Sequence, residues 1–188
     1  MWKVRKLRNL AETNKAGLLY QRGDEAWRKG NLRSAFRFFL SAARAGMLPA
    51  CGIVANFYDH GMGVKSNEHA ALYWYRRAAR DGDRSAANNM GCIWRNRGKL
   101  RRALGWFERA VKLGDADANL EIAKIYLRKG DSAKARPYLN KTRRSPWATE
   151  QSKEEAGLLL KKLTTKSAAR SGLRQAQKSG SARVAVGG

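Results

Sequence analysis

Apolar residues recur along this chain with helical spacing, in short stretches that each end at a glycine. In the clearest stretch, Phe107, Ala110 and Val111 are spaced i, i+3 and i+4, which places them on one face of a helix. Gly114 then follows at the position where a glycine commonly ends a helix. The pattern predicts a chain of helices of ordinary length with no β-strand.

The apolar stretches are copies of one another. Each aligns on a small residue and, four positions later, on a bulky one, and successive copies are 36, 32 and 32 residues apart. Periods of this size predict stacked supersecondary units, and each stretch is the second helix of its unit. The small positions are Ala35, Ala71, Ala103 and Ala135, and the bulky positions are Phe39, Tyr75, Phe107 and Leu139.

A first helix precedes each of these second helices. Residues 85–98 and 116–130 align with each other, with glycine or alanine where neighbouring helices would approach closely and an aromatic residue three positions later. Aspartates stand where these first helices begin, which suits a helix N-terminus. The aligned pairs are Ala86 with Ala118, Gly91 with Ala123 and Trp94 with Tyr126, and the aspartates are Asp83, Asp115 and Asp117.

Residues Tyr58–Gly82, which read YDHGMGVKSNEHAALYWYRRAARDG, resemble the Sel-one-like repeat, a branch of the tetratricopeptide superfamily. The Gly61-Met62-Gly63-Val64 loop and the small and aromatic positions after it carry the likeness, which extends from about Ala16 to Arg143. The resemblance implies an all-α fold, a right-handed α-solenoid of about four helix-turn-helix repeats, whose first helices line a concave face. It also implies an adaptor or scaffold that binds another protein.

We expect four segments along the chain. Residues 1–14 form a basic N-terminal cap segment and residues 15–147 form the repeats. Residues 148–163 form an amphipathic helix that covers the last hairpin, because terminal repeats need a polar outer surface. Residues 164–188 contain no acidic and few large apolar residues, so we expect a disordered basic tail.

Net charge narrows the range of partners. The chain has 39 Lys and Arg against 15 Asp and Glu, a formal charge of +24, which favours an acidic protein as partner, with nucleic acid as the alternative. No catalytic motif, phosphate-binding loop or metal-ligand spacing occurs, so we expect no enzyme activity, no cofactor, no metal and no small-molecule substrate. Cys51 and Cys92 are expected to be buried thiols. We expect a cytoplasmic protein without membrane association, since the N-terminus lacks a signal-peptide core and no apolar run could span a bilayer.

The resemblance nominates a partner-binding groove on the first helices, suited to a peptide or a helix. Asn56 and Asn89 match two asparagines with which some tetratricopeptide proteins grip a terminal carboxylate, but the basic positions of that clamp hold Gly52, Asp117 and Glu121. Acidic residues there would repel a carboxylate, so that clamp is rejected. The nominated groove residues are Tyr20, Asp24, Trp27, Asn56, Asp59, Asn88, Asn89, Cys92, Arg95, Lys124 and Leu127.

Basic residues also gather in the turn inside each hairpin. Helix-end electrostatics explain one or two cations per turn but not the five between Arg95 and Arg102. These turns predict a basic ridge, the alternative site, which would bind nucleic acid through its phosphates. The ridge residues are Arg28, Lys29, Arg33, Arg95, Arg97, Lys99, Arg101, Arg102, Arg128 and Lys129.

Overall fold

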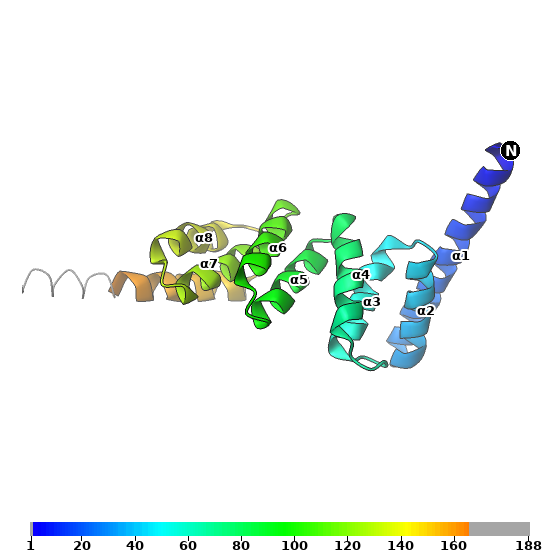
Figure 1. The fold of residues 1–188 in the computed structure, drawn as a ribbon, viewed down its shortest axis with the longest axis horizontal. Coiled ribbons are helices and arrows are strands. Elements are labelled where there is room, and N and C mark those ends of the chain that lie inside the picture. Colours follow the sequence, from blue (N-terminus) through cyan, green and yellow to red (C-terminus); the bar gives the residue numbers. More distant parts are fainter. Residues whose placement is uncertain (1, 166–188) are drawn as a thin grey trace, which may run out of the picture. The chain divides into compact units, whose positions relative to one another are not determined.

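The computed structural model describes the backbone of residues 2–165 and the side chains of residues 14–165. Within those residues the regular secondary structure is entirely α-helical, as the sequence predicts (Figure 1). Residues 166–188, most of the expected basic tail, lie outside this description. The helices are α1 (Trp2–Arg28), α2 (Leu32–Arg44), α3 (Leu48–His60), α4 (Glu68–Arg80), α5 (Arg84–Asn96), α6 (Leu100–Lys112), α7 (Ala118–Arg128), α8 (Ser132–Arg144) and a last helix over residues 150–165.

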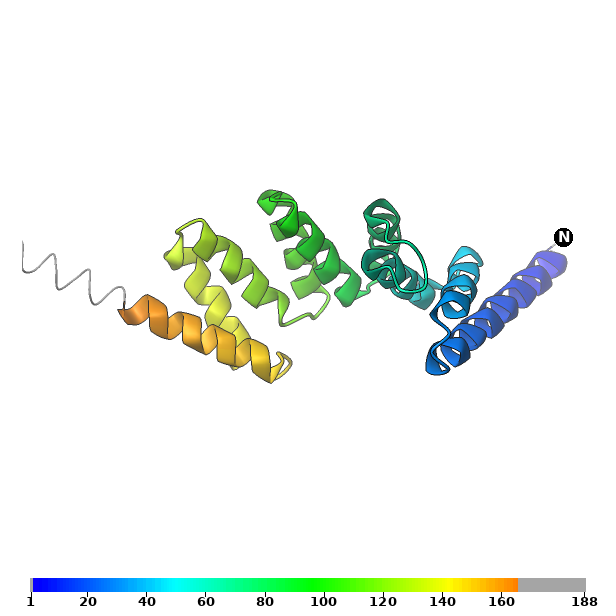
Figure 2. The ribbon, with the colours of Figure 1, turned by 90° about the horizontal axis from the view of Figure 1, so that it is seen from below.

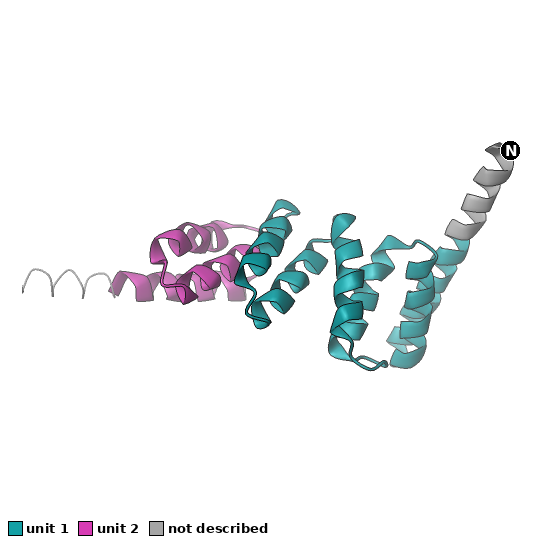
Figure 3. Cartoon of the chain, viewed as in Figure 1, with its two compact units in different colours: residues 1–115 teal, residues 116–188 magenta. Residues whose placement is uncertain are grey.

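The helices pair in chain order into four hairpins. The pairs α1–α2, α3–α4 and α5–α6 belong to one compact unit, Met1–Asp115, which we call unit 1. The pair α7–α8 and the last helix belong to unit 2, Ala116–Gly188 (Figure 3). Within unit 1, α2 also contacts α3 and α4 contacts α5, so its three hairpins stack one on the next (Figure 2). Helix α1 is continuous from Trp2, so the expected cap segment 1–14 shares one helix with the first repeat.

Polar side chains begin the helices and glycines end them. Asn31, Asn67 and Asp83 each accept a hydrogen bond from the backbone N–H three residues later, at 3.0–3.1 Å, which satisfies a donor that the first turn leaves unpaired. The predicted terminal glycines adopt the left-handed conformation that only glycine reaches without strain. They are Gly46, Gly82 and Gly114, with φ of 94°, 98° and 92°.

Close helix contact within a hairpin depends on a glycine facing an aromatic ring. A Cβ atom on Gly91 of α5 would lie 2.5 Å from a ring carbon of Phe107 of α6, and one on Gly23 of α1 would lie 2.8 Å from Phe39 of α2. Phe107 is fully buried and Phe39 nearly so. The small residues on the first helices therefore leave the space that the bulky residues on the second helices fill.

The loop between α3 and α4 is longer than the corresponding turns of the other hairpins and packs against the neighbouring hairpin. A Cβ atom on Gly63, whose φ is 63°, would lie 2.5 Å from the carbonyl carbon of Leu32 at the start of α2. The loop thus packs directly on the backbone of α2. This contact fixes the position of Met62 beside the first hairpin.

In unit 2 the last helix covers α7 and α8, at the place where we expected a capping helix over residues 148–163. Its Ala156 is buried in one cluster with Ala123 of α7 and Leu139 of α8. At its start, Thr149 donates from its backbone N–H to Asp117, 2.9 Å away, and accepts a hydrogen bond from the backbone N–H of Ser152. These contacts fix the position of the last helix on α7.

The glycine–aromatic contact predicts the effect of adding one methyl group. Gly91→Ala should lower the free energy of unfolding by up to about 2 kcal/mol, because overpacking against a fully buried ring costs about 1–3 kcal/mol and alanine adds only about 1 kcal/mol to helix stability. Urea denaturation followed by circular dichroism measures the change.

Gly105→Ala is the matched control, since a Cβ atom there meets nothing within 4 Å. It should raise stability by about 0.5–1 kcal/mol. Gly91→Ala combined with Phe107→Leu should recover part of the loss, because the fourth hairpin already pairs Ala123 with Leu139. Equal effects of the two glycine substitutions would contradict the proposed packing.

Candidate functional site

A pocket of about 440 Å³ lies in unit 1 between α1, α3 and the loop that follows α3. Four of the residues nominated for the groove line it, on the first helices of the first two hairpins. Five others were not nominated, because their sequence context indicated core or loop. The lining residues, which define the α1–α3 pocket, are Tyr20, Asp24, Trp27, Phe39, Ile53, Asn56, Phe57, His60 and Met62.

Aromatic rings packed edge to face make the wall of this pocket. The ring centroids of Tyr20 and Phe39 are 5.3 Å apart, and those of Trp27 and Phe57 are 5.2 Å apart. Phe57 is fully buried, whereas Trp27 keeps 42% of its surface exposed. A rigid inner ring thus supports an accessible outer one, which is the arrangement of an aromatic anchor at a protein interface.

A buried tyrosine hydroxyl organises the polar floor beside the pocket. The hydroxyl of Tyr75 on α4 donates to Asn56 Oδ1 at 2.6 Å, with Asp59 Oδ2 3.2 Å away, both on α3. Asn89 on α5 donates from Nδ2 to the Tyr75 oxygen at 3.1 Å and lies 3.3 Å from Asn56 Oδ1. We call these four residues the Tyr75 cluster, and it joins the second hairpin to the third.

The environment of Tyr75 keeps its hydroxyl protonated. Burial of the side chain raises the pKa of Tyr75 well above the ordinary value, and the negative charge of Asp59 raises it further. The proton therefore remains available for the hydrogen bonds to Asn56 and Asp59 across the physiological pH range. The cluster is a fixed structural feature under these conditions.

The structure brings some of the nominated groove residues together and separates others. Tyr20, Asp24, Trp27 and Asn56 line the α1–α3 pocket, while Asp59 and Asn89 belong to the Tyr75 cluster. Asn88, Cys92 and Arg95 are partly buried on α5 and line no part of that pocket.

Two nominated positions contact the last helix of unit 2 instead. Lys124 forms an ion pair with Glu155 of that helix at 2.9 Å, and Leu127 packs on the cluster that contains Ala156. The last helix thus occupies the face of α7 that we nominated for a partner. The sequence predicts a helix that covers the last hairpin, but the nomination of Lys124 and Leu127 does not take that cover into account.

Helices α3 and α5 carry little positive charge for so basic a chain. Helix α3 contains no Lys or Arg and carries Asp59 next to its last residue, His60, and Asp24 lines the α1–α3 pocket. Asn56 and Asn89 do lie together, but their amides bond to each other and to Tyr75. The rejection of the carboxylate clamp is therefore consistent with the geometry, and the pocket edge favours cations over anions.

Several cations of the expected basic ridge have local partners. Arg28 pairs with Asp24 at 3.1 Å within α1, and Lys29, just after α1, pairs with Glu25 at 2.6 Å. These exposed pairs add little stability, but they place a carboxylate beside each cation.

The cations near Arg97 pack on a tryptophan. Arg97 pairs with Glu68 of α4, and the guanidiniums of Arg97 and Arg102 lie 5.1 and 4.7 Å from the centre of the Trp94 ring. Cation–π contacts of this kind orient the guanidinium groups. The ridge residues Arg33, Lys99, Arg101, Arg128 and Lys129 are exposed at their turns.

Other kinds of site find no support among the described side chains. They contain no cluster of three His, Cys, Asp or Glu residues able to hold a metal ion. Cys51 is buried, and burial raises the pKa of its thiol, whereas Cys92 is only partly buried, contrary to the expectation for both. In the described part of the chain no helix combines the length and apolar character needed to cross a membrane.

The sequence and the fold of this chain are similar to those of known repeat proteins. The model of the Sel1 repeat matches residues 9–47, 49–83 and 85–115, more than half of the chain. A segment of 56 residues is 39% identical to the chitin synthase regulator SKT5 of Saccharomyces cerevisiae, a match that spans 30% of this chain and 8% of that protein.

Two similar solved structures are both 26% identical to this chain. They are a Sel1 repeat protein from Oxalobacter formigenes, with a TM-score of 0.59, and c5321, a protective antigen of uropathogenic Escherichia coli strains that displays an SLR fold, with a TM-score of 0.60. The matches cover 68% and 73% of this chain, but 57% and 32% of those chains. The chain thus spans less than two thirds of each of these two structures and a small part of the chitin synthase regulator.

The Tyr75 cluster predicts a stability change that depends on pH. Tyr75→Phe should lower the free energy of unfolding by about 1–3 kcal/mol near pH 8, because Asn56 and Asp59 keep their polar atoms but lose the hydroxyl. Above about pH 10 the unfolded parent chain loses the tyrosine proton while the folded chain retains it, so this group stabilises the folded parent less as pH rises.

The difference in the free energy of unfolding between the parent and Tyr75→Phe should therefore shrink by about 1 kcal/mol between pH 8 and pH 11. Urea titrations at the two pH values measure it. A difference that does not change with pH would contradict a buried, protonated Tyr75.

Proposed function

Because the chain belongs to the Sel1 repeat family, we propose that it is an adaptor that holds a peptide or helix of a partner protein against the first helices of unit 1, centred on the α1–α3 pocket. Sel1 repeat proteins are generally protein-interaction scaffolds, and their fold is typically non-catalytic. The observation that carries the finer proposal is the pocket itself, an aromatic-walled hollow on the repeat face where a partner is expected.

The size and lining of the pocket suit a bulky apolar side chain of the partner. A volume of about 440 Å³ lies within the range of small-molecule and peptide-anchor sites. Ile53 and Met62 supply apolar surface, and the half-exposed Trp27 loses water on contact. An aromatic or large aliphatic residue of the partner would bury its side chain there.

The charges near the pocket suggest the neighbours of that anchor residue. Asp24 and Asp59 are acidic, and α3 carries no Lys or Arg. A Lys or Arg beside the apolar anchor would complement these carboxylates and favour the partner in one orientation. The acidic partner that the net charge of the chain favours is therefore poorly suited to this pocket, and the basic residues of unit 1 remain for another contact.

Selection from a random peptide library on the full chain tests the proposal. The enriched peptides should combine an aromatic or large aliphatic residue with a nearby Lys or Arg. Trp27→Ala should weaken binding of such a peptide about tenfold or more, measured by fluorescence anisotropy, because an aromatic anchor at an interface contributes about 2 kcal/mol or more. Asp24→Asn should weaken the binding of peptides with a Lys or Arg and leave the affinity of neutral peptides unchanged.

Trp147→Ala provides the matched control, because Trp147 is 83% exposed, belongs to unit 2 and does not line the pocket. It should leave the affinity of the selected peptides unchanged. If Trp27→Ala and Trp147→Ala behave alike, the α1–α3 pocket is not the binding site.

A further inference from the structure

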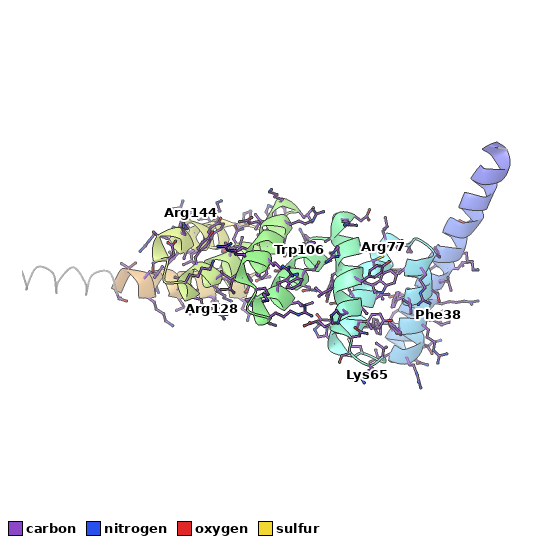
Figure 4. The ribbon with its side chains drawn as sticks, viewed as in Figure 1. Phe38, Lys65, Arg77, Trp106, Arg128 and Arg144 are labelled. Carbon is purple, nitrogen blue, oxygen red and sulfur yellow. The ribbon has the colours of Figure 1, made fainter. Side chains whose placement is uncertain are left out.

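A second pocket lies on α4 and shares no residue with the α1–α3 pocket. Its volume is about 520 Å³, and four of its six lining residues fall at i, i+3, i+4 and i+7 of one helix, so they form a single face. The lining residues, which define the α4 pocket, are Leu48, Tyr73, Arg76, Arg77, Arg80 and Asp81. Figure 4 labels Arg77 on this helix.

Positive charge dominates the α4 pocket. Three guanidiniums face a single carboxylate, that of Asp81. Arg77 lies with its guanidinium 5.6 Å from the centre of the Trp74 ring, which holds it in place. Arg109 of α6, which is not a lining residue, donates from Nη2 to the carbonyl oxygen of Ala79 at 2.8 Å at the same end of α4. The pocket is therefore built to receive negative charge.

The second helices of unit 1 are all rich in cations. Helices α2, α4 and α6 contain ten Lys and Arg residues, three on α2, three on α4 and four on α6, against Glu68 and Glu108. Glu68 is already paired with Arg97. By contrast, α3 and α5 together contain only Arg84 and Arg95, although α1, the first helix of the first hairpin, contains seven Lys and Arg. In the second hairpin a polyanion would thus be attracted to α4 and not to α3.

An exposed aromatic ring distinguishes the α4 pocket from a plain basic patch. Tyr73 keeps 59% of its surface exposed, and its ring packs edge to face on the buried Trp74 with centroids 5.1 Å apart. Few large apolar side chains in the described part of the chain are as exposed as Tyr73. Another exposed one is Trp27, which lines the α1–α3 pocket. An accessible ring among arginines is the combination that stacks nucleobases while the cations hold phosphates.

We infer that the α4 pocket binds single-stranded nucleic acid, with an unpaired base stacked on Tyr73 and successive phosphates on Arg76 and Arg80. Those two residues are four positions apart, about 6 Å along the helix axis, a distance that one nucleotide of an extended strand bridges. A duplex offers phosphates but no free base face, and a peptide with only acidic side chains offers carboxylates but no ring to stack on Tyr73. The pocket therefore favours the single strand over both.

Fluorescence anisotropy with a labelled ten-nucleotide oligothymidine and the full chain tests this inference. Tyr73→Ala should weaken binding by about 5- to 150-fold, since stacking on one aromatic side chain contributes that range, and it should leave the salt dependence unchanged. Tyr73→Phe should bind like the parent, because the ring remains. A hairpin duplex with the same number of phosphates should bind more weakly than the single strand.

The charge arm uses two variants that each remove two cations. Arg76→Gln with Arg80→Gln should reduce the slope of log affinity against log salt by about 1.4, at about 0.7 per phosphate contact on a single strand. Arg128→Gln with Lys129→Gln, at the predicted ridge on unit 2, should leave the slope unchanged. Circular dichroism melting establishes that each variant is folded.

Three results would overturn the inference. One is absence of binding by the parent at about 0.1 M salt. Another is an equal loss of affinity for both double variants with no effect of Tyr73→Ala, which would show diffuse attraction between charges. The third is competition by polyglutamate as strong as that by oligothymidine, which would identify an acidic protein as the ligand.

Discussion

The close approach of the two helices in each hairpin is the constraint on which the rest of the structure depends. Gly23 and Gly91 leave no side chain where Phe39 and Phe107 lie, and Ala123 stands opposite Leu139 at the same repeat position in unit 2. A bulky residue can fill this space only at one alignment of the helices, so the contact fixes which residues of the first helix face outward. The lining of the α1–α3 pocket follows from that alignment, since Phe39 both fills the contact and forms part of the pocket wall.

In the second hairpin, a residue with a polar group fills the space between the two helices. Tyr75 occupies the bulky position, and its hydroxyl reaches the first helices, where Asn56 and Asp59 accept hydrogen bonds from it and Asn89 donates to its oxygen. A buried hydroxyl without these partners would be costly. The polar groups that the resemblance assigned to ligand binding therefore serve partly to satisfy the core, which explains why the asparagine pair is present without the rest of a carboxylate clamp.

Sequence periodicity predicts the fold well because the repeat, the terminal glycines and the small–bulky pairs are all local patterns. It predicts the site only in part. Tyr20 and Trp27 follow from the resemblance, but Phe57 and Met62 are indistinguishable in sequence from core and loop residues. Contacts between distant positions, such as Arg97 with Glu68 or Lys124 with Glu155, leave no local pattern at all. The i, i+3, i+4 and i+7 spacing of Tyr73 and the arginines of α4 can be read from the sequence. Only the exposure of Tyr73 in the structure identifies that face as a candidate binding site.

The long loop of the second hairpin bears on how such an array can evolve. Its additional residues place Met62 in the wall of the α1–α3 pocket and seat Gly63 on the backbone of α2. Hairpins with the short turn could be duplicated or exchanged and still stack, because their packing contacts recur. Exchange of the second hairpin for a short-turn copy would keep the stack but remove one wall of the pocket. Duplication of short-turn hairpins would thus lengthen the array without adding further copies of the pocket. The architecture is modular, whereas recognition at this pocket depends on the contact between the first and second hairpins.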